Sequence, residues 1–237
     1  MGYIGVTKVH TSIQPRHEWK HYITYGDFLA LKSRLGQIAE PDAYARKTGG
    51  TYRVRSLYFD NYQDKVLREK LYGVRDRDKF RLRYYNTDTS RVKLEKKSKK
   101  NGLCEKRSVW LSKEECEGLV RGDCAFLLEK QDPLCTEFYA RIQAEQLRPK
   151  VLVEYMREPY VYALGNVRIT IDSGIKTGLW NTEFLTDALC VVPVPDDVRI
   201  LEVKYDHFLP EIIKDMIQLP ERQVSSYSKY AASRMYG

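Results

Sequence analysis

The segment KFRLRYYN, residues 79–86, alternates cations with bulky apolar side chains. Successive side chains of a β-strand point to opposite faces, so Lys79, Arg81 and Arg83 would share one face. Arginine forks onto pairs of phosphate oxygens, and lysine adds a compact point charge. Cations held this close repel one another unless an anion neutralises them. The segment therefore indicates a site for a ligand that carries several phosphates.

The same alternation of charged and apolar residues recurs along the chain. It is present in RVKLEKKS (91–98), in RITID (168–172), in ILEVKY (200–205) and in the first expected strand. In the third of these segments Glu202 and Lys204 share a face. On strand after strand, one face is expected to be charged and the other apolar.

The positive charge is concentrated in one stretch. The chain has 237 residues and a formal net charge of +8. Residues 65–107 hold 16 Lys and Arg against 6 Asp and Glu, a net of +10, and the remainder of the chain has a net of −2. Such a distribution favours a polyanionic partner, which could be polyphosphate, a nucleotide, nucleic acid or anionic lipid.

Several classes of protein are disfavoured by composition. A hydrophobic content of 43% supports a substantial core and argues against a disordered chain. The sequence contains no run of about 18 apolar residues, so no membrane-spanning helix is predicted. The N-terminal residues lack the apolar core of a signal peptide, and we therefore expect a cytoplasmic protein. The five cysteines are odd in number and form no CxxC pair, which predicts reduced structural thiols, Cys190 included.

The elements that would position these charges are mostly strands. Helices are expected from a cap at Asp27 to about residue 38, from Ser112 with Glu115 as a capping box to about 120, and from Asp132 to about 147. A helix is also expected over 209–219, and a short helix or turn over 225–235. Strands are predicted over 15–24, 52–61, 79–85, 91–98, 104–111, 150–164, 167–175 and 199–206, with a short strand or turn-rich segment over 65–73. The class is α+β, mostly antiparallel, and one domain over 1–237 is the simplest organisation.

Two architectures satisfy the alternation. In a sandwich, the apolar faces form the core and the charged faces meet solvent. In a closed eight-stranded barrel, the charged faces line a cationic lumen and helices cover the apolar outside. Solvent faces normally mix both signs of charge, whereas here Arg-x-Arg and Glu-x-Lys pairs lie in the middle of strands. This difference favours the barrel.

The motifs together resemble a known family. YRVRSLYFDN, REKLYGVRDRDKFRLRYYN, LEKKSKKNGLCEKRSVWL, EYMREPYV, VRITID, LEVKYD and SYSKY occur in the order found in the VTC domain, the polyphosphate polymerase module. This module belongs to the triphosphate tunnel metalloenzymes, relatives of the CYTH proteins. The resemblance runs from about residue 16 to about 230. It implies an eight-stranded antiparallel tunnel that transfers the γ-phosphate of ATP to inorganic polyphosphate with a divalent metal, Mn²⁺ or Mg²⁺.

The resemblance also assigns residues by position. It implies that Glu202 holds the metal, and Glu18 on the first expected strand is a candidate second ligand. The expected transfer residues are Arg81, Arg83, Arg168 and Lys97, with Glu202. Phosphate-binding positions are Lys20, Arg68, Arg81, Arg83, Lys97, Lys106, Arg157, Arg168, Lys204, Ser228 and Lys229, with Lys106 subject to a shift of one or two residues in the register of 96–107.

One departure from the wider superfamily narrows the function. The CYTH proteins carry Glu-x-Glu-x-Lys on the first strand, whereas this chain has Arg16 at the first position. A carboxylate is replaced by a cation, which fits the VTC branch better than thiamine-triphosphatase or adenylate-cyclase chemistry. A metal-dependent phosphotransferase that uses ATP and polyphosphate, and no nucleic acid, is the leading hypothesis. A triphosphate hydrolase, a non-catalytic module that binds polyphosphate or inositol polyphosphate, and an RNA-binding protein are the alternatives.

Overall fold

Eight long strands form the frame of the molecule. The computed structural model describes residues 16–186, 191–194, 198–219 and 227–235. The strands are β1 (His17–Ile23), β3 (Tyr52–Asp60), β4 (Arg77–Tyr85), β5 (Val92–Lys100), β6 (Leu103–Leu111), β7 (Arg148–Tyr162), β8 (Val167–Thr177) and β10 (Arg199–Tyr205), with two-residue strands β2 (Glu40–Pro41) and β9 (Val192–Pro193) at the margins.

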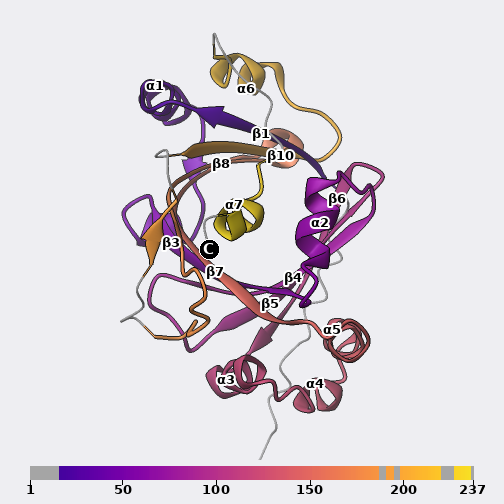
Figure 1. Ribbon diagram of the computed structural model, residues 1–237. Helices are drawn as coiled ribbons and strands as arrows, with labels where there is room; N and C mark the ends of the chain where they lie inside the picture. The colour runs from indigo at the N-terminus through magenta and orange to yellow at the C-terminus, as the bar shows by residue number, and fades with distance from the viewer. Residues whose placement is uncertain (1–15, 187–190, 195–197, 220–226, 236–237) are drawn as a thin grey trace, which may run out of the picture.

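The sheet curls until its two edges meet. Its strands follow the order β1-β10-β8-β7-β3-β4-β5-β6, and the paired strands are antiparallel. An isolated bridge joins the edges: the backbone N–H of Arg16 donates to the carbonyl of Cys104 at 3.2 Å, and the reverse bond is 3.4 Å. Viewed along its axis the sheet forms a ring (Figure 1). The predicted barrel, and not the sandwich, is the fold.

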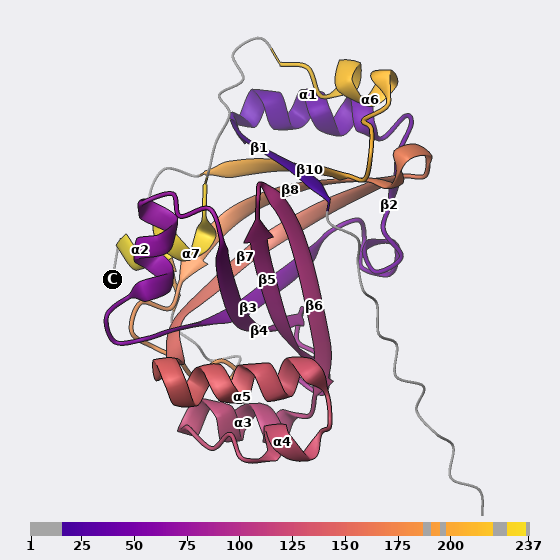
Figure 2. The same ribbon diagram turned by 90° about the vertical axis from the view of Figure 1, so that its right-hand side faces the viewer.

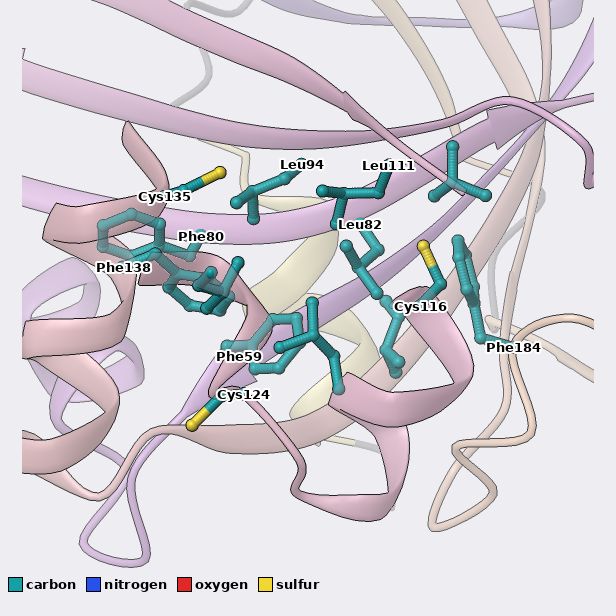
Figure 3. Packing of buried hydrophobic residues seen from close by; sticks show 14 of the residues in the cluster. Phe59, Phe80, Leu82, Leu94, Leu111, Cys116, Cys124, Cys135, Phe138 and Phe184 are labelled. Atoms are coloured by element: carbon teal, nitrogen blue, oxygen red, sulfur yellow. The ribbon is translucent and has the colours of Figure 1, made fainter. Parts of the chain in front are cut away.

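Helices cover the outside of the ring at two places. Helices α1 and α6 pack on β1, β10 and β8, while α3, α4 and α5 lie across the opposite side (Figure 2). Under α5, the rings of Phe80 and Phe138 stack with centroids 4.8 Å apart, and Figure 3 shows the apolar cluster around them. The helices are α1 (Tyr25–Leu35), α2 (Lys65–Leu71), α3 (Lys113–Arg121), α4 (Phe126–Glu129), α5 (Pro133–Glu145), α6 (Glu211–Met216) and α7 (Lys229–Met235), with 3₁₀ turns at Ala45–Lys47 and Leu164–Asn166.

The alternation of the sequence produces this arrangement directly. On β4 the side chains of Phe80, Leu82 and Tyr84 are buried beneath the outer helices. Arg81 and Arg83, between them, face inward and line a cavity. Burial of the apolar residues outside the ring stabilises the fold, because each such side chain contributes about 1.5–3 kcal/mol. The cations are then directed to the lumen by the pleat of the strand.

Helix α7 lies at one end of the ring beside α2 (Figure 2), within the outline of the ring when it is viewed along its axis (Figure 1). The phenol of Tyr230 donates a hydrogen bond to Asp60, and its ring is 5.2 Å from that of Tyr58 on β3. Arg234 forms an ion pair with Asp64 at 2.9 Å. The helix is therefore anchored to β3 and to the turn that leads into α2, and it closes part of the lumen.

Some local predictions were wrong. Residues 65–71 form helix α2 instead of a strand or turn, because Leu, Arg, Glu and Lys all favour helix. The cap of α1 is Thr24, whose side chain accepts from the backbone of Asp27, and the helix ends at Leu35 rather than near residue 38. Four cysteines are free thiols, as expected, whereas Cys190 and residues 225–226 lie outside the described residues.

None of the helices within the described ranges has both the length and the apolar character that crossing a membrane requires.

The contact between Tyr230 and Asp60 should be measurable as stability. Replacing Tyr230 by Phe removes a hydrogen bond to a buried carboxylate, which should lower the free energy of unfolding by about 1.5–3 kcal/mol. Urea unfolding would measure the change, with Tyr72→Phe as the control because Tyr72 is 79% exposed. Equal stability of the two variants would show that α7 is not anchored through this hydroxyl.

Candidate functional site

The interior of the ring holds a cavity of about 520 Å³. Every strand of the ring, except β2 and β9 at its margins, contributes to its wall, and helices α2 and α7 add side chains at one end. All but one of the predicted site residues line it. These residues are Glu18, Lys20, Arg81, Arg83, Lys97, Lys106, Arg157, Arg168, Glu202, Lys204, Ser228 and Lys229.

Arg68 is the exception. It lies on helix α2 with an exposed side chain and does not line the cavity. Lys70, two residues further along the same helix, does line it. The prediction placed Arg68 before a loop. Residues 68 and 70 instead lie on a helix, where residues two apart do not share a face. The helix thus presents a different cation to the lumen.

Glu95 on β5 holds the first group of cations. Its Oε2 is 2.7 Å from Nη2 of Arg81 and 3.6 Å from Nη1 of Arg83, and its Oε1 is 3.1 Å from Nζ of Lys106. Arg81 and Arg83 also receive support from the hydroxyls of Tyr58 and Ser56. Burial raises the pKa of Glu95, but Arg81 and Arg83 outweigh it and hold that pKa well below its usual range.

Asp172 on β8 holds the second group. The guanidinium of Arg157 binds it in a bidentate arrangement, with both N–O distances 2.7 Å, and Nζ of Lys229 lies 2.7 Å from Oδ2. Burial raises the pKa of Asp172, while Arg157 and Lys229 lower it to about 2. Lys229 enters from helix α7, so this carboxylate fixes the helix and the strand wall to each other.

Glu18 and Glu202 share a third group of cations. Lys97 and Lys20 lie 2.6 Å and 2.9 Å from Glu18, and Lys204 lies 3.0 Å from Glu202. Lys20 is also 3.9 Å from Glu202, and Lys204 is 3.8 Å from Glu18. Burial and the charge of Glu202 raise the pKa of Glu18, but the three lysines lower it to about 2. Both carboxylates are therefore ionised at neutral pH.

Arg168 stands apart from these groups. Its guanidinium contacts Asp42 at 2.8 Å and the hydroxyl of Tyr52 at 3.0 Å. It is nevertheless on β8, in the register position opposite Lys204 of β10, and it lines the cavity. A phosphate in the cavity would therefore compete with Asp42 for this arginine.

Lys79 was on the cationic face of the opening segment but was not assigned to the site. It lines the cavity, and its ammonium donates to Oγ of Ser228 at 3.1 Å and lies 5.3 Å from the ring centroid of Tyr230. Burial lowers the pKa of Lys79 to about 7, and the charges of Lys20 and Lys97 act in the same direction. Its spacing of two from Arg81 was the signal that could have included it.

Glu95, Thr170 and Asp172 lie in segments whose alternation predicted a charged face, but they were not assigned to the site. Glu95 and Asp172 pair with cations on neighbouring strands, and these pairings depend on how the strands are aligned. Thr170 faces the lumen between Arg168 and Asp172, and its buried Oγ1 has no hydrogen-bond partner among the described residues. A buried hydroxyl without a partner costs free energy, so a ligand that supplies one would bind favourably.

The family resemblance implies a divalent metal, and the residues present fit one. Glu202 and Thr170 are register partners on adjacent strands, so their side chains are neighbours. Glu18 reaches the same lysines as Glu202. Within the described residues no group of three or more His, Cys, Asp or Glu side chains could hold a metal ion. Mg²⁺ commonly takes one or two carboxylates and completes its shell with water and substrate phosphates, and this donor set matches that use.

Comparison with known proteins identifies the family. The family model of the VTC domain matches residues 15–236. The chain belongs to the VTC domain family. A search among curated proteins found no match for this VTC domain.

The solved structure of HpAC1 supports the same fold. HpAC1 from Hippeastrum, a candidate adenylyl cyclase described as having a dominant triphosphatase activity, aligns with a TM-score of 0.53 at 13% identity. The alignment covers 93% of this VTC domain and 96% of that chain. A candidate adenylate cyclase from Bacillus halodurans aligns with a TM-score of 0.46 at 16% identity, over 80% of this chain and 79% of the other.

The titration of Lys79 is the property of the cavity that an anion should change most. In the free VTC domain Lys79 should lose its proton near pH 7. A bound polyphosphate favours the charged ammonium, so the midpoint should move upward by about one pH unit or more. Nuclear magnetic resonance of ¹³C-lysine-labelled protein, with and without tripolyphosphate, would measure this midpoint. The Lys79→Arg variant would identify the Lys79 signal by its loss. A Lys79 signal that titrates near pH 10 in both states would contradict this account.

Proposed function

We propose that this VTC domain is a metal-dependent phosphotransferase that moves the γ-phosphate of ATP onto the end of an inorganic polyphosphate chain. The observation that carries the proposal is a cavity where paired arginines and lysines are held in place by ionised carboxylates. Phosphoryl transfer depends on positioning and on neutralising charge more than on covalent chemistry by the protein. Family membership supports the same conclusion.

Arg81 and Arg83 are the strongest candidates to cradle the triphosphate. Glu95 fixes both guanidinium groups before any ligand arrives, so little reorganisation is needed on binding. Each guanidinium has five N–H donors, and Glu95, Tyr58 and Ser56 occupy only some of them. The remaining donors are available to phosphate oxygens in a partly dehydrated space, where hydrogen bonds to charged groups are strong.

The transfer step requires no strong general base. An oxygen of the terminal phosphate of the acceptor, already ionised, attacks the γ-phosphorus of ATP and forms the new P–O bond. The bond between the γ-phosphorus and the bridging β–γ oxygen breaks, and ADP leaves with the electron pair. Arg157 and Arg168, which line the same cavity, can neutralise negative charge on the phosphates around this step.

The metal would be held by Glu202 and Glu18, with the hydroxyl of Thr170 within the same group. When bound there, it would supply positive charge that stabilises the transferring phosphate and the leaving group. Lys20 and Lys204 now neutralise the two carboxylates. Both lysines line the cavity, where their ammonium groups can also neutralise substrate phosphates.

Hydrolysis of a triphosphate is the second candidate. The same cavity would serve if water attacked in place of the acceptor phosphate. One observation favours this alternative: HpAC1, which shares the fold, is described as having a dominant triphosphatase activity. The two functions differ in their products, so product analysis separates them.

Incubation with ATP and Mn²⁺ tests the proposal, with products resolved by gel electrophoresis and phosphorus magnetic resonance. The wild-type protein should form a polyphosphate ladder. Arg83→Ala and Glu202→Gln should each lower the rate by about 10²–10³-fold, the usual effect of removing one preorganised charge-stabilising group. Arg121→Ala is the matched control, because Arg121 is an exposed arginine on α3.

The outcomes are distinct. Release of orthophosphate without a ladder, lost in the same two variants, would replace the polymerase with a hydrolase. ATP left intact with Mn²⁺ and with Mg²⁺ would contradict both enzymatic functions and favour a binding module. Equal losses in Arg121→Ala would mean that the effect does not arise in the cavity.

A further inference from the structure

The lumen face of β4 changes from cationic to aromatic at the C-terminal end of the strand. Lys79, Arg81 and Arg83 are followed on the same face by Tyr85, which also lines the cavity. Residues two apart on a strand are separated by about 6.6 Å, so Tyr85 lies one such step beyond Arg83. A ligand held by Arg83 therefore meets an aromatic ring on the side away from Lys79.

Two further tyrosines hold the ring of Tyr85 in place. The ring centroid of Tyr52 on β3 is 5.5 Å from that of Tyr85 at an interplanar angle of 87°, and the centroid of Tyr44 is 5.5 Å away at 48°. Tyr52 is buried, whereas Tyr85 is half-buried and Tyr44 is 38% exposed. The three rings, here called the tyrosine cluster, thus form a fixed aromatic group that keeps accessible surface on Tyr85 and Tyr44.

The polar contacts of the cluster fix it to the wall of the lumen. The hydroxyl of Tyr52 donates to Asp42 at 3.0 Å and accepts from Arg168 at 3.0 Å. The hydroxyl of Tyr44 accepts from Nδ2 of Asn86 at 3.2 Å. Because Arg168 also lines the cavity, the cluster is joined directly to a phosphate-binding candidate.

The cations of the cavity act on Tyr85 itself. Burial raises the pKa of Tyr85, and the charge of Glu95 acts in the same direction. The charges of Arg83, Lys106 and Lys93 outweigh them and leave that pKa lowered. The ring therefore lies close enough to these cations for one small ligand to contact both. Such a ligand would place anionic groups at the cations and a flat uncharged ring against the tyrosine.

We infer that Tyr85, supported by Tyr44 and Tyr52, stacks on the base of the nucleotide, so that the nucleoside of ATP lies at this end of the lumen and its triphosphate lies along Arg83 and Arg81. This inference rests on the proposed function, because it takes ATP as the phosphate donor. The ribose spans the step from the phosphate at Arg83 to the base at Tyr85. Every base has a π face, so the cluster should contribute affinity for any nucleoside triphosphate and discriminate little between bases.

Trp110 on β6 is the competing aromatic side chain. It is 48% exposed and is the register partner of Lys93, which is in turn the partner of Arg83. Nζ of Lys93 lies 4.4 Å from the ring centroid of Trp110, and Cζ of Arg91 lies 5.5 Å from it. The π system of Trp110 thus already serves two cations, and Trp110 does not line the cavity, whereas Tyr85 does. These differences favour Tyr85.

The test compares the binding of ATP with that of tripolyphosphate, measured by calorimetry without metal or acceptor. Tyr85→Leu should weaken ATP binding about 5–100-fold, whereas the affinity for tripolyphosphate, which has no base, should change less than about twofold. Tyr85→Phe keeps the ring and should bind ATP as the wild type does. Trp110→Leu is the matched control, since it removes an exposed aromatic ring at the same level of the wall.

A second variant gives a spectroscopic readout and applies even where Tyr85→Leu fails to fold. In Tyr85→Trp the new indole should be quenched when ATP stacks on it, beyond any change in the wild-type fluorescence. Tripolyphosphate should leave this fluorescence unchanged. Equal quenching by both ligands would overturn the inference, because it would report a general change on anion binding instead of base stacking.

The outcomes separate this inference from the proposed function. Equal losses of ATP and tripolyphosphate binding in Tyr85→Leu would show that Tyr85 only supports Arg83, and would overturn the inference. A loss of ATP binding in Trp110→Leu and none in Tyr85→Leu would do the same. A protein whose ATP binding depends on Tyr85 but that forms no polyphosphate would disprove the polymerase and retain the base-stacking position. Polyphosphate formation with ATP affinity unchanged in Tyr85→Leu would retain the function and disprove that position.

Discussion

Cations that face one another inside a narrow cavity repel strongly, and the whole interior of this VTC domain is organised around that repulsion. Two unit charges 4 Å apart interact by about 4 kcal/mol at an effective dielectric constant of about 20. A few ionised carboxylates in the lumen reduce this repulsion, and each of them pairs with several cations. Glu95 holds Arg81, Arg83 and Lys106, and Asp172 holds Arg157 and Lys229. Without these carboxylates the strands could not bring so many cations together.

The sharing of one carboxylate among several cations has a second effect. Such a carboxylate accepts hydrogen bonds from only some of the donors of each cation. The cations stay oriented but keep free donors, so a polyanion can bind without first breaking the wall of the cavity. The interior is thus stable enough to fold and still attractive to phosphate. Helix α7 belongs to the same system, since Lys229 joins it to Asp172 and Tyr230 joins it to Asp60.

The alternation of charged and apolar residues predicted which side chains share a face, because a strand has a simple period of two. The Arg-x-Arg and Glu-x-Lys pairs in the middle of strands, together with the family resemblance, then favoured the barrel over the sandwich. At Arg81 and Arg83 the sequence alone placed the side chains correctly. It failed at Arg68 because residues 65–71 form a helix, where positions 68 and 70 point in different directions. The partnership of Arg157 with Asp172 could not be predicted, since it depends on how β7 aligns with β8. Local periodicity determines faces, whereas tertiary register determines partners.

The bridge between Arg16 and Cys104 gives the ring one weak seam. Each of the other junctions between neighbouring strands is a ladder of at least five residue pairs, whereas two backbone hydrogen bonds close this one. Side chains also cross this seam, since Lys97 of β5 donates to Glu18 of β1 at 2.6 Å. Parting the ring here would break these few contacts and leave every ladder intact.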